Sequence, residues 1–146
     1  MVNVKDLMVG NFVKTPIGVV EVYNIINDAI IADTRDICYV KGLEGIPITK
    51  ELLKKIGFEK DTTAGEPWPY WRYWDKDGRY KLDVYPEEFF CNSNRKFGLH
   101  VDNDVCNTIG TGEFTYVHEL QNLTRCITGH SLPITKEVFD GLGNDA

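Results

Sequence analysis

The chain has 146 residues, of which 42% are hydrophobic and 26% are charged, as in a folded globular protein of one domain or two small lobes. Its 22 acidic and 16 basic side chains give a formal net charge of −6. This charge argues against binding to duplex DNA, because that function needs a dominant basic face. No apolar run is long enough to span a bilayer, so we expect no membrane partner.

The first 45 residues carry the signals of short β-strands. The strand candidates "NFVKT", "VVEVYNII", "AIIAD" and "ICYVKG" are separated by turn signals such as Pro-Ile-Gly and Asn-Asp. In the second candidate, Val20, Val22 and Asn24 are expected to share one face. Four short strands with tight turns predict a small curled sheet, an SH3-like β-barrel lobe spanning residues 1–45.

Residues 46–130 are expected to form a second unit that begins with a short helix in "IPITKELLKKIG". Thr49 suits the N-cap of this helix, and Gly57 suits the position just after its end. The polar, turn-rich segment 60–69 is interpreted as a loop. The predicted buried stripe of the helix is Leu52, Leu53 and Ile56.

A β-hairpin is predicted in "YWRYWDKDGRYKLDVY", residues 70–85. Its Asp77-Gly78 pair is typical of a two-residue turn, which fixes the register of the two strands and therefore their faces. One face should be core, with Trp71 opposite Val84 and Tyr73 opposite Leu82. The other face should carry Tyr70, Arg72, Trp74, Lys81 and Tyr85, which we take as candidate binding residues.

Three interpretations of this aromatic and basic face remain open. The N-terminal lobe could cover it, and then it would be core. It could be a hot spot for another protein, which aromatic residues and arginine favour. It could also bind a planar, phosphorylated ligand, with a ring on the aromatics and the phosphate on Arg72 and Lys81.

A second strand pair is predicted in "KFGLHVDN" and "DVCNTIG", followed by a closing helix over residues 115–128. The whole chain then reads as an α+β fold, in which a short helix leads to an antiparallel sheet packed by the closing helix. At 100° per residue, one arc of that helix is apolar, and it contains Tyr116, Leu120, Leu123 and Ile127.

The opposite arc of the closing helix contains His118, Gln121, Asn122 and Arg125. The simpler interpretation makes this arc the solvent face of an amphipathic helix. The functional alternative is that His118, Asn122 and Arg125 form a polar strip facing a partner or another lobe. The three residues are therefore further candidate binding residues.

The tail, residues 131–146, repeats a motif of the first helix. "LPITKEVFDGLG" shares Pro-Ile-Thr-Lys-Glu with "IPITKELLKKIG" and likewise ends in glycine. We predict a short helix with Ile134, Val138 and Phe139 in an apolar groove, because so short a helix is marginal alone. The groove could belong to the same domain or to a second copy, which would make a symmetric homodimer paired through the tail.

Three segments resemble uncharacterised proteins of Bacteroides-type bacteria, their prophages and their phages. The first is "YVHELQNLTRCITG", with the His-x-Leu-Gln-Asn-Leu helix and Thr-Gly stop typical of that group. "VKDLMVGNFV" and "IPITKELLKKIGF" are similar to two other segments of the group. At Thr124 and Arg125, however, the group more often has bulky aromatic or apolar residues. The resemblance implies a phage or mobile-element context and carries no activity with it.

No catalytic motif is recognisable in the sequence, so no catalytic residues are assigned. His100, Asp102 and Asp104 could share a strand face, but a metal site needs further ligands and none is evident, so neither metal nor cofactor is expected. A Cys–His nucleophile could combine Cys91 or Cys106 with His100 or His118, and nothing favours one pairing.

The cysteines Cys38, Cys91, Cys106 and Cys126 show no close pairing, which is typical of reduced core residues. With no signal peptide apparent, we expect a cytoplasmic protein. The leading hypothesis is a non-enzymatic protein of phage or mobile-element origin that binds another protein, as a host-defence or accessory factor. The alternatives are a binder that sequesters a small nucleotide-like signal, and an enzyme with no recognisable motif.

Overall fold

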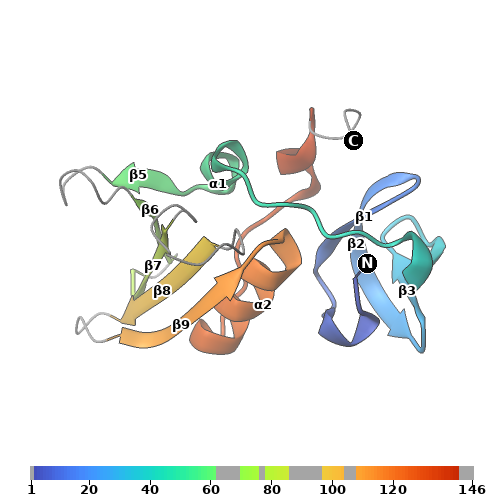
Figure 1. Cartoon of the computed structure of the whole chain (residues 1–146), viewed down its shortest axis with the longest axis horizontal. Coiled ribbons are helices and arrows are strands. Elements are labelled where there is room, and N and C mark those ends of the chain that lie inside the picture. Colours follow the sequence, from blue (N-terminus) through green and yellow to red (C-terminus); the bar gives the residue numbers. More distant parts are fainter. Residues whose placement is uncertain (1, 62–69, 76–77, 86–96, 104–107, 142–146) are drawn as a thin grey trace.

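The computed structural model describes residues 2–61, 70–75, 78–85, 97–103 and 108–141. They form two β-sheet regions with the longer helix and the C-terminal tail between them (Figure 1). In chain order the elements are the 3₁₀ turn η1 (Val4–Asp6), β1 (Phe12–Thr15), β2 (Gly18–Ile26), β3 (Ala29–Ala32), β4 (Ile37–Tyr39), the 3₁₀ turn η2 (Val40–Gly42), α1 (Lys50–Ile56), β5 (Glu59–Asp61), β6 (Tyr70–Trp74), β7 (Tyr80–Tyr85), β8 (Phe97–Asn103), β9 (Thr108–Phe114), α2 (Val117–Thr128) and the 3₁₀ turn η4 (Lys136–Phe139).

The N-terminal region is a curled antiparallel half-barrel with the strand order β1-β2-β3-β4. Its four strands match the four predicted from the sequence. Gly18 ends the turn between β1 and β2 with a φ of 117°, a conformation that favours glycine. Beyond β4 the chain returns to β1, where Lys14 and Glu44 exchange two backbone hydrogen bonds of 2.9 Å.

The strand β2 changes face in its middle. Val20 and Val22 share one face as predicted, and both are buried, but Asn24 is exposed, so the prediction that Asn24 shares their face was wrong. The cause is a register shift between Val22 and Asn24, which inserts one extra residue opposite β3. Such a bulge turns the following side chains over, and Ile25 packs against the N-terminal core instead.

The helix α1 forms where the sequence predicts it. The Thr49 hydroxyl accepts a hydrogen bond from the Leu52 amide at 3.1 Å, which caps the first turn. Gly57 ends the helix with a φ of 123°. Leu52, Leu53 and Ile56 are all buried in the larger apolar core, as expected.

The second region is a five-stranded antiparallel sheet with the order β5-β6-β7-β8-β9. The predicted hairpin register is confirmed, because Trp71 pairs with Val84 and Tyr73 with Leu82. The ladder closes where the Asp75 amide donates to the Tyr80 carbonyl at 2.9 Å. The turn residue Asp77 lies outside the described residues.

Two boundaries in this sheet differ from the prediction. Residues 60 and 61 are not loop but belong to β5 (Glu59–Asp61), which pairs with β6 through Glu59 and Arg72. A three-residue polar strand at a sheet edge has no periodic signal long enough to detect. The last strand, β9, runs through Phe114 rather than stopping at Gly110, so α2 begins at Val117.

The helix α2 lies close against β9 because two glycines leave room for it. A Cβ atom on Gly110 would lie 2.7 Å from the Ile127 side chain, and one on Gly112 would lie 2.7 Å from Leu123. Tyr116, predicted to be core, instead precedes the helix and is exposed. The first turn is capped by Glu119, whose Oε1 accepts the amides of Thr115 and Tyr116 at 3.0 Å each.

The buried apolar side chains form two clusters. The smaller cluster fills the half-barrel, and the larger one lies between α1, α2 and the five-stranded sheet. Phe12 of β1 belongs to the larger cluster, so the half-barrel is joined to the second region by apolar contact.

The tail docks on its own chain. Phe139 is buried, with its ring centroid 5.0 Å from that of Phe12, while Ile134 and Val138 are partly buried against the same cluster. The predicted helix is a single 3₁₀ turn, η4, because a chain this short gains little from helix propagation. Lys136 also bonds to Asp33 at 3.0 Å, which ties the tail to the half-barrel.

Candidate functional site

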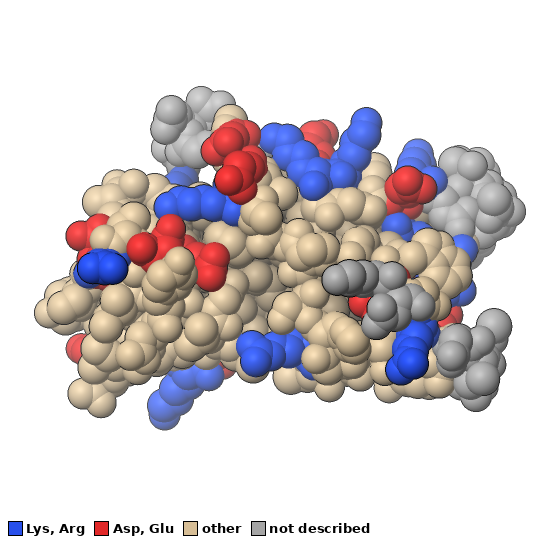
Figure 2. Space-filling model, turned by 180° about the vertical axis from the view of Figure 1, so that it is seen from behind, with Lys and Arg blue, Asp and Glu red and all other residues tan. Residues whose placement is uncertain are grey.

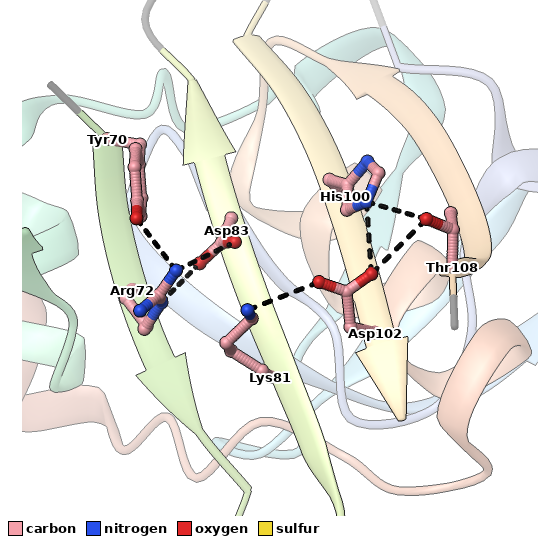
Figure 3. A network of polar contacts seen from close by, with 7 residues as sticks. All are labelled: Tyr70, Arg72, Lys81, Asp83, His100, Asp102 and Thr108. Atoms are coloured by element: carbon pink, nitrogen blue, oxygen red, sulfur yellow. Dashed lines mark hydrogen bonds and ion pairs between the residues drawn. The ribbon is translucent and has the colours of Figure 1, made fainter. Parts of the chain in front are cut away.

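Of the predicted hairpin residues, Tyr70, Arg72 and Lys81 lie on the outer face of the five-stranded sheet, opposite the side that packs against α2 (Figure 3). Their exposures differ widely. Trp74 is 58% exposed, whereas Tyr70 is only 9% exposed and packs against Tyr85 in a tilted ring pair with centroids 5.4 Å apart. The face is thus neither wholly core nor wholly open.

The two cations of this face are already paired with carboxylates. The predicted hairpin register places Asp83 opposite Arg72, which is confirmed, whereas the pairing of Lys81 with Asp102 was missed. Arg72 Nε donates to Asp83 Oδ1 at 2.8 Å, and Asp83 is only 3% exposed. Lys81 Nζ lies 3.3 Å from Asp102 Oδ2 (Figure 3). The expectation of a basic face was therefore wrong: each cation lies opposite an acid on the neighbouring strand, so a phosphate would have to displace that acid.

The pairing is reflected in the protonation of two groups. Burial alone would raise the pKa of Asp102, but the hydrogen bond from Lys81 and the nearby charge of His100 hold it below its ordinary value. Burial, followed by the charge of Asp83, raises the pKa of Tyr85. Asp102 thus stays ionised and Tyr85 neutral, which suits a structural network.

His100, Asp102 and Thr108 form a cluster whose geometry does not suit catalysis (Figure 3). His100 Nε2 lies 3.0 Å from Asp102 Oδ1 and 2.9 Å from Thr108 Oγ1. A nucleophile relay needs the acid on one ring nitrogen and the hydroxyl on the other, whereas both contact the same nitrogen here. Asp104 lies outside the described residues, and within the described part of the chain no group of three or more ligands could hold a metal.

The polar arc of α2 faces the half-barrel. Asn122 accepts a hydrogen bond from Asn11 Nδ2 and donates one to the Asp6 carbonyl, both at 2.8 Å. The interpretation of this arc as a solvent face was therefore wrong, and the alternative that it faces another lobe describes Asn122. Arg125, the third member of the strip, is exposed.

The Gln121 side chain makes two hydrogen bonds to the half-barrel backbone, although Gln121 was not a candidate binding residue. Its Oε1 accepts the Phe12 amide at 3.0 Å, and its Nε2 donates to the Gly10 carbonyl at 3.0 Å. The side chain thus satisfies backbone groups at the start of β1. The adjacent amides of Gln121 and Asn122 on a predicted helix were the signal that could have pointed to such docking.

His118 is 4% exposed and stacks on Tyr116, with ring centroids 5.8 Å apart. Burial lowers the pKa of His118, while the charges of Glu119 and Asp6 oppose this shift. Its Nδ1 has no hydrogen-bond partner among the described residues. The ring also borders a cavity of about 130 Å³ between η1 and the start of α2. His118 is therefore a neutral group at the junction of the two regions.

Arg125 borders a second cavity, of about 180 Å³, between the half-barrel, α2 and the tail. Glu21 of β2 also lines this cavity, and burial followed by the charge of Asp33 raises the pKa of that carboxyl. The volume is below the range of about 300–1,000 Å³ that drug-sized ligands occupy. The cavity is therefore too small for a nucleotide-like ligand.

An apolar hollow lies on the half-barrel, and sequence reasoning missed it. It has a volume of about 380 Å³ and lies between β4 and the turn that joins β1 to β2. Ile17, Ile37 and Tyr39 on its rim are 64%, 58% and 62% exposed. Ile37 and Tyr39 flank Cys38 in "ICYVKG", and this alternation placed two large side chains on the outward face of the strand.

The cysteines fit the core expectation only in part. Cys38 is partly buried against the core of the half-barrel, and burial raises the pKa of its thiol. Cys126 is exposed on α2, so the prediction that it is a core residue was wrong. Cys91 and Cys106 lie outside the described residues.

The charged side chains form no basic field on the face shown in Figure 2, where Lys and Arg are interspersed with Asp and Glu. None of the described helices is long and apolar enough to cross a membrane. Comparisons with protein-family models, with curated proteins and with solved structures found no match to this chain. The function must therefore be inferred from the surfaces themselves.

Proposed function

We propose that this chain is a non-enzymatic protein that binds another protein through the apolar hollow of its half-barrel. The observation that carries the proposal is the exposure of Ile17, Ile37 and Tyr39, each more than half exposed, around a single hollow. Exposed apolar area costs free energy in water, about 25 cal/mol per Å², which contact with a partner recovers. Apolar surface that is both concave and contiguous is typical of protein interaction sites.

The proposed context is a phage or mobile genetic element. The resemblance of "YVHELQNLTRCITG" to proteins of Bacteroides-type bacteria and their phages supports this origin. In that setting the protein would act in the cytoplasm, as a host-defence or phage accessory factor. The half-barrel would serve as an SH3-like scaffold that presents its rim to the partner.

The two rival functions have weaker support. A nucleotide-like ligand on the hairpin face would need Arg72 and Lys81, and both already face a carboxylate within 3.3 Å. An enzyme would need a correctly ordered relay, and the His100 cluster has both partners on one nitrogen. Protein binding needs no rearrangement of the observed contacts.

Affinity capture with matched variants tests the proposal. The tagged wild-type chain is incubated with lysate of a Bacteroides-type host, in parallel with Ile37→Lys and Ile109→Lys. Ile109 is also an exposed isoleucine on a strand, but it lies on β9, away from the hollow. We expect a protein that wild type and Ile109→Lys recover equally and that Ile37→Lys recovers at least about tenfold less, a difference of ~1.4 kcal/mol.

The partner is then purified and its binding to the three chains is measured directly. Equal capture by wild type and Ile37→Lys would refute the hollow as the site. A Trp74→Ala variant tests the alternative site. If this variant alone loses binding of the partner, the site lies on the hairpin face. A thermal shift with cyclic or ADP-ribose-like nucleotides, in the absence of any protein partner, would favour the small-ligand function.

A further inference from the structure

The strand β4 forms an open edge of the half-barrel sheet. The order β1-β2-β3-β4 leaves both β1 and β4 at the ends. The β1 edge is covered, because Lys14 exchanges two backbone hydrogen bonds with Glu44. No other strand in the described part of the chain pairs with the outer side of β4. An open edge of this kind can accept a strand from another chain.

The hydrogen-bond phase of β4 shows which backbone groups face outward. Ile30 and Cys38 are opposite each other and form the middle pair of the ladder. The flanking bonds run from the Ala32 amide to the Asp36 carbonyl and from the Val40 amide to the Asp28 carbonyl, each 2.9 Å long. In an antiparallel ladder this arrangement makes Ile30 and Cys38 the pair that exchanges both bonds.

The neighbours of Cys38 must then point the other way. The amide and carbonyl of Ile37 and the amide of Tyr39 are directed away from β3, toward the open edge. These groups are two residues apart, which is the spacing at which an added strand forms its bonds. Neither Ile37 nor Tyr39 belongs to the residue types, lysine and proline, that usually protect an edge.

The apolar hollow lies directly beside this edge. Ile37, Cys38 and Tyr39 of β4 form one wall, and Pro16 and Ile17 of the turn between β1 and β2 form another. A strand that bonded to β4 would lay every second side chain toward the hollow. The edge would thus supply main-chain hydrogen bonds, and the hollow would supply apolar contact for alternate residues.

The charge beside the hollow defines the partner further. Among the described residues that line the hollow, Asp36 carries the charge and none is lysine or arginine. The whole chain carries a net charge of −6. A complementary strand therefore carries a lysine or arginine next to its apolar residues, which also favours association by electrostatic attraction.

We propose that an extended segment of the partner protein adds to β4 as an extra strand, with alternate apolar side chains in the hollow and a basic residue at Asp36. This inference rests on the proposed function, because it specifies how the hollow is occupied. The added strand would lie between β4 and the turn of residues 15–18, on the open side of the half-barrel.

A peptide selection tests the chemistry of the segment. A random dodecapeptide library displayed on phage is panned on the full chain, with removal of peptides that also bind Ile37→Lys. We expect the surviving peptides to alternate apolar with polar residues and to contain lysine or arginine. Asp36→Lys should weaken them at least about tenfold, or ~1.4 kcal/mol, whereas Asp28→Lys, on the turn between β2 and β3, should not. Selected peptides that lack alternating apolar and polar residues would overturn the proposal.

Backbone methylation tests the strand pairing itself. Two versions of a selected peptide are made, each N-methylated on one of the two alternate sets of residues. An added strand has only one set of amides facing β4, so one version should lose at least about tenfold in affinity, ~1.4 kcal/mol, and the other should bind normally. Amide exchange at Ile37 and Tyr39 should slow at least about tenfold in the complex, as hydrogen-bonded amides do.

The outcomes separate this inference from the proposed function. Peptides that need Ile37 but tolerate both methylation patterns would overturn strand addition and leave the hollow as a docking site. Peptides indifferent to Ile37→Lys would overturn both. A second copy of this chain is the other conceivable occupant: a dimer in light scattering that Ile37→Lys converts to a monomer would replace the partner strand with self-pairing.

Discussion

The outer face of the five-stranded sheet and the hollow of the half-barrel differ in how far their polar and apolar groups are already satisfied within the fold. On the sheet, Arg72 and Lys81 each contact an acid across the strand pair, and Tyr70 is nearly buried. On the half-barrel, large apolar side chains surround a hollow beside backbone groups that no described strand pairs with.

This difference shows that composition is a poor guide to binding capacity. The hairpin is rich in aromatic and basic residues, which suggested a site. Cross-strand neighbours satisfy those residues, because opposite charges on paired strands stabilise the sheet. The half-barrel has an ordinary composition, yet its surface retains unsatisfied groups. Predictions follow from treating the first surface as structural and the second as functional.

The largest effect is expected from breaking the joint between the two regions. Phe139 is 4% exposed and contacts Phe12 of the half-barrel. Phe139→Ala should lower the free energy of unfolding by about 3–5 kcal/mol, because it removes a buried ring and leaves a cavity. Urea unfolding measures the loss. Val138→Ala, at a partly buried neighbour, should cost about 1 kcal/mol.

Deletion of residues 131–146 extends this test to the assembly. With the tail docked on its own chain, the deletion should lower the melting temperature. The number of chains in each particle, measured by light scattering, should stay the same. A change from dimer to monomer in light scattering would instead support the tail-exchanged homodimer. Equal stability of wild type and Phe139→Ala would contradict the docking of the tail.

The second prediction tests whether the polar face is structural. Arg72→Ala should lower the free energy of unfolding by about 3 kcal/mol, the lower end for breaking a buried ion pair, since the Arg72 side chain is 22% exposed. Asp83 would then remain buried without its main cation. Lys81→Ala breaks a more open pair and should cost below about 1 kcal/mol.

The double variant Arg72→Met with Asp83→Leu is the control for this pair. Removing both charges at once leaves no unpaired buried charge, so the double variant should recover most of the stability lost by Arg72→Ala. Partner capture should be retained by these variants, because the proposed site is on the half-barrel. A stable Arg72→Ala chain that loses its partner would reverse the assignment of the two faces.

The sequence predicted elements whose signals are local. The cap at Thr49, the glycine at position 57 and the alternation around Asp77-Gly78 depend on neighbouring residues alone, and α1 and the hairpin register followed from them. The short strand β5 and the bulge in β2 were missed, because both depend on the partner strand. The α+β class therefore needed only the local patterns.

The predictions of candidate sites were wrong where contacts between residues distant in the sequence determine which side chains are exposed. The hairpin register correctly placed Asp83 opposite Arg72, but the sequence could not reveal that Asp102 on the next strand faces Lys81. Nor could it reveal that Gln121 and Asn122 bond to the start of β1, more than a hundred residues away in the chain. A helical face with adjacent amide side chains is equally polar whether it faces solvent or another region of the protein, so its sequence does not distinguish the two settings.

The smallest expected effect is a pH dependence at the junction of the two regions. Burial lowers the pKa of His118 in the folded chain, against the opposing charges of Glu119 and Asp6, while in the unfolded chain it is about 6.5. The unfolded state therefore binds more protons between these two values, so stability is full above about pH 6.5 and is lost as the pH falls toward the folded pKa. One proton limits the slope to about 1.4 kcal/mol per pH unit.

Urea unfolding of the wild type and of His118→Phe between pH 7 and pH 5 measures this term. Phenylalanine keeps a flat ring to stack on Tyr116 but cannot be protonated, so its stability should vary less over this range. Asp33 and Asp102, whose pKa values are lowered, affect stability only at lower pH, where these carboxylates are protonated. If both chains lose stability equally between pH 6.5 and pH 5, protonation of His118 does not weaken the junction. If only the wild type does, the docking of the half-barrel on α2 depends on a neutral imidazole.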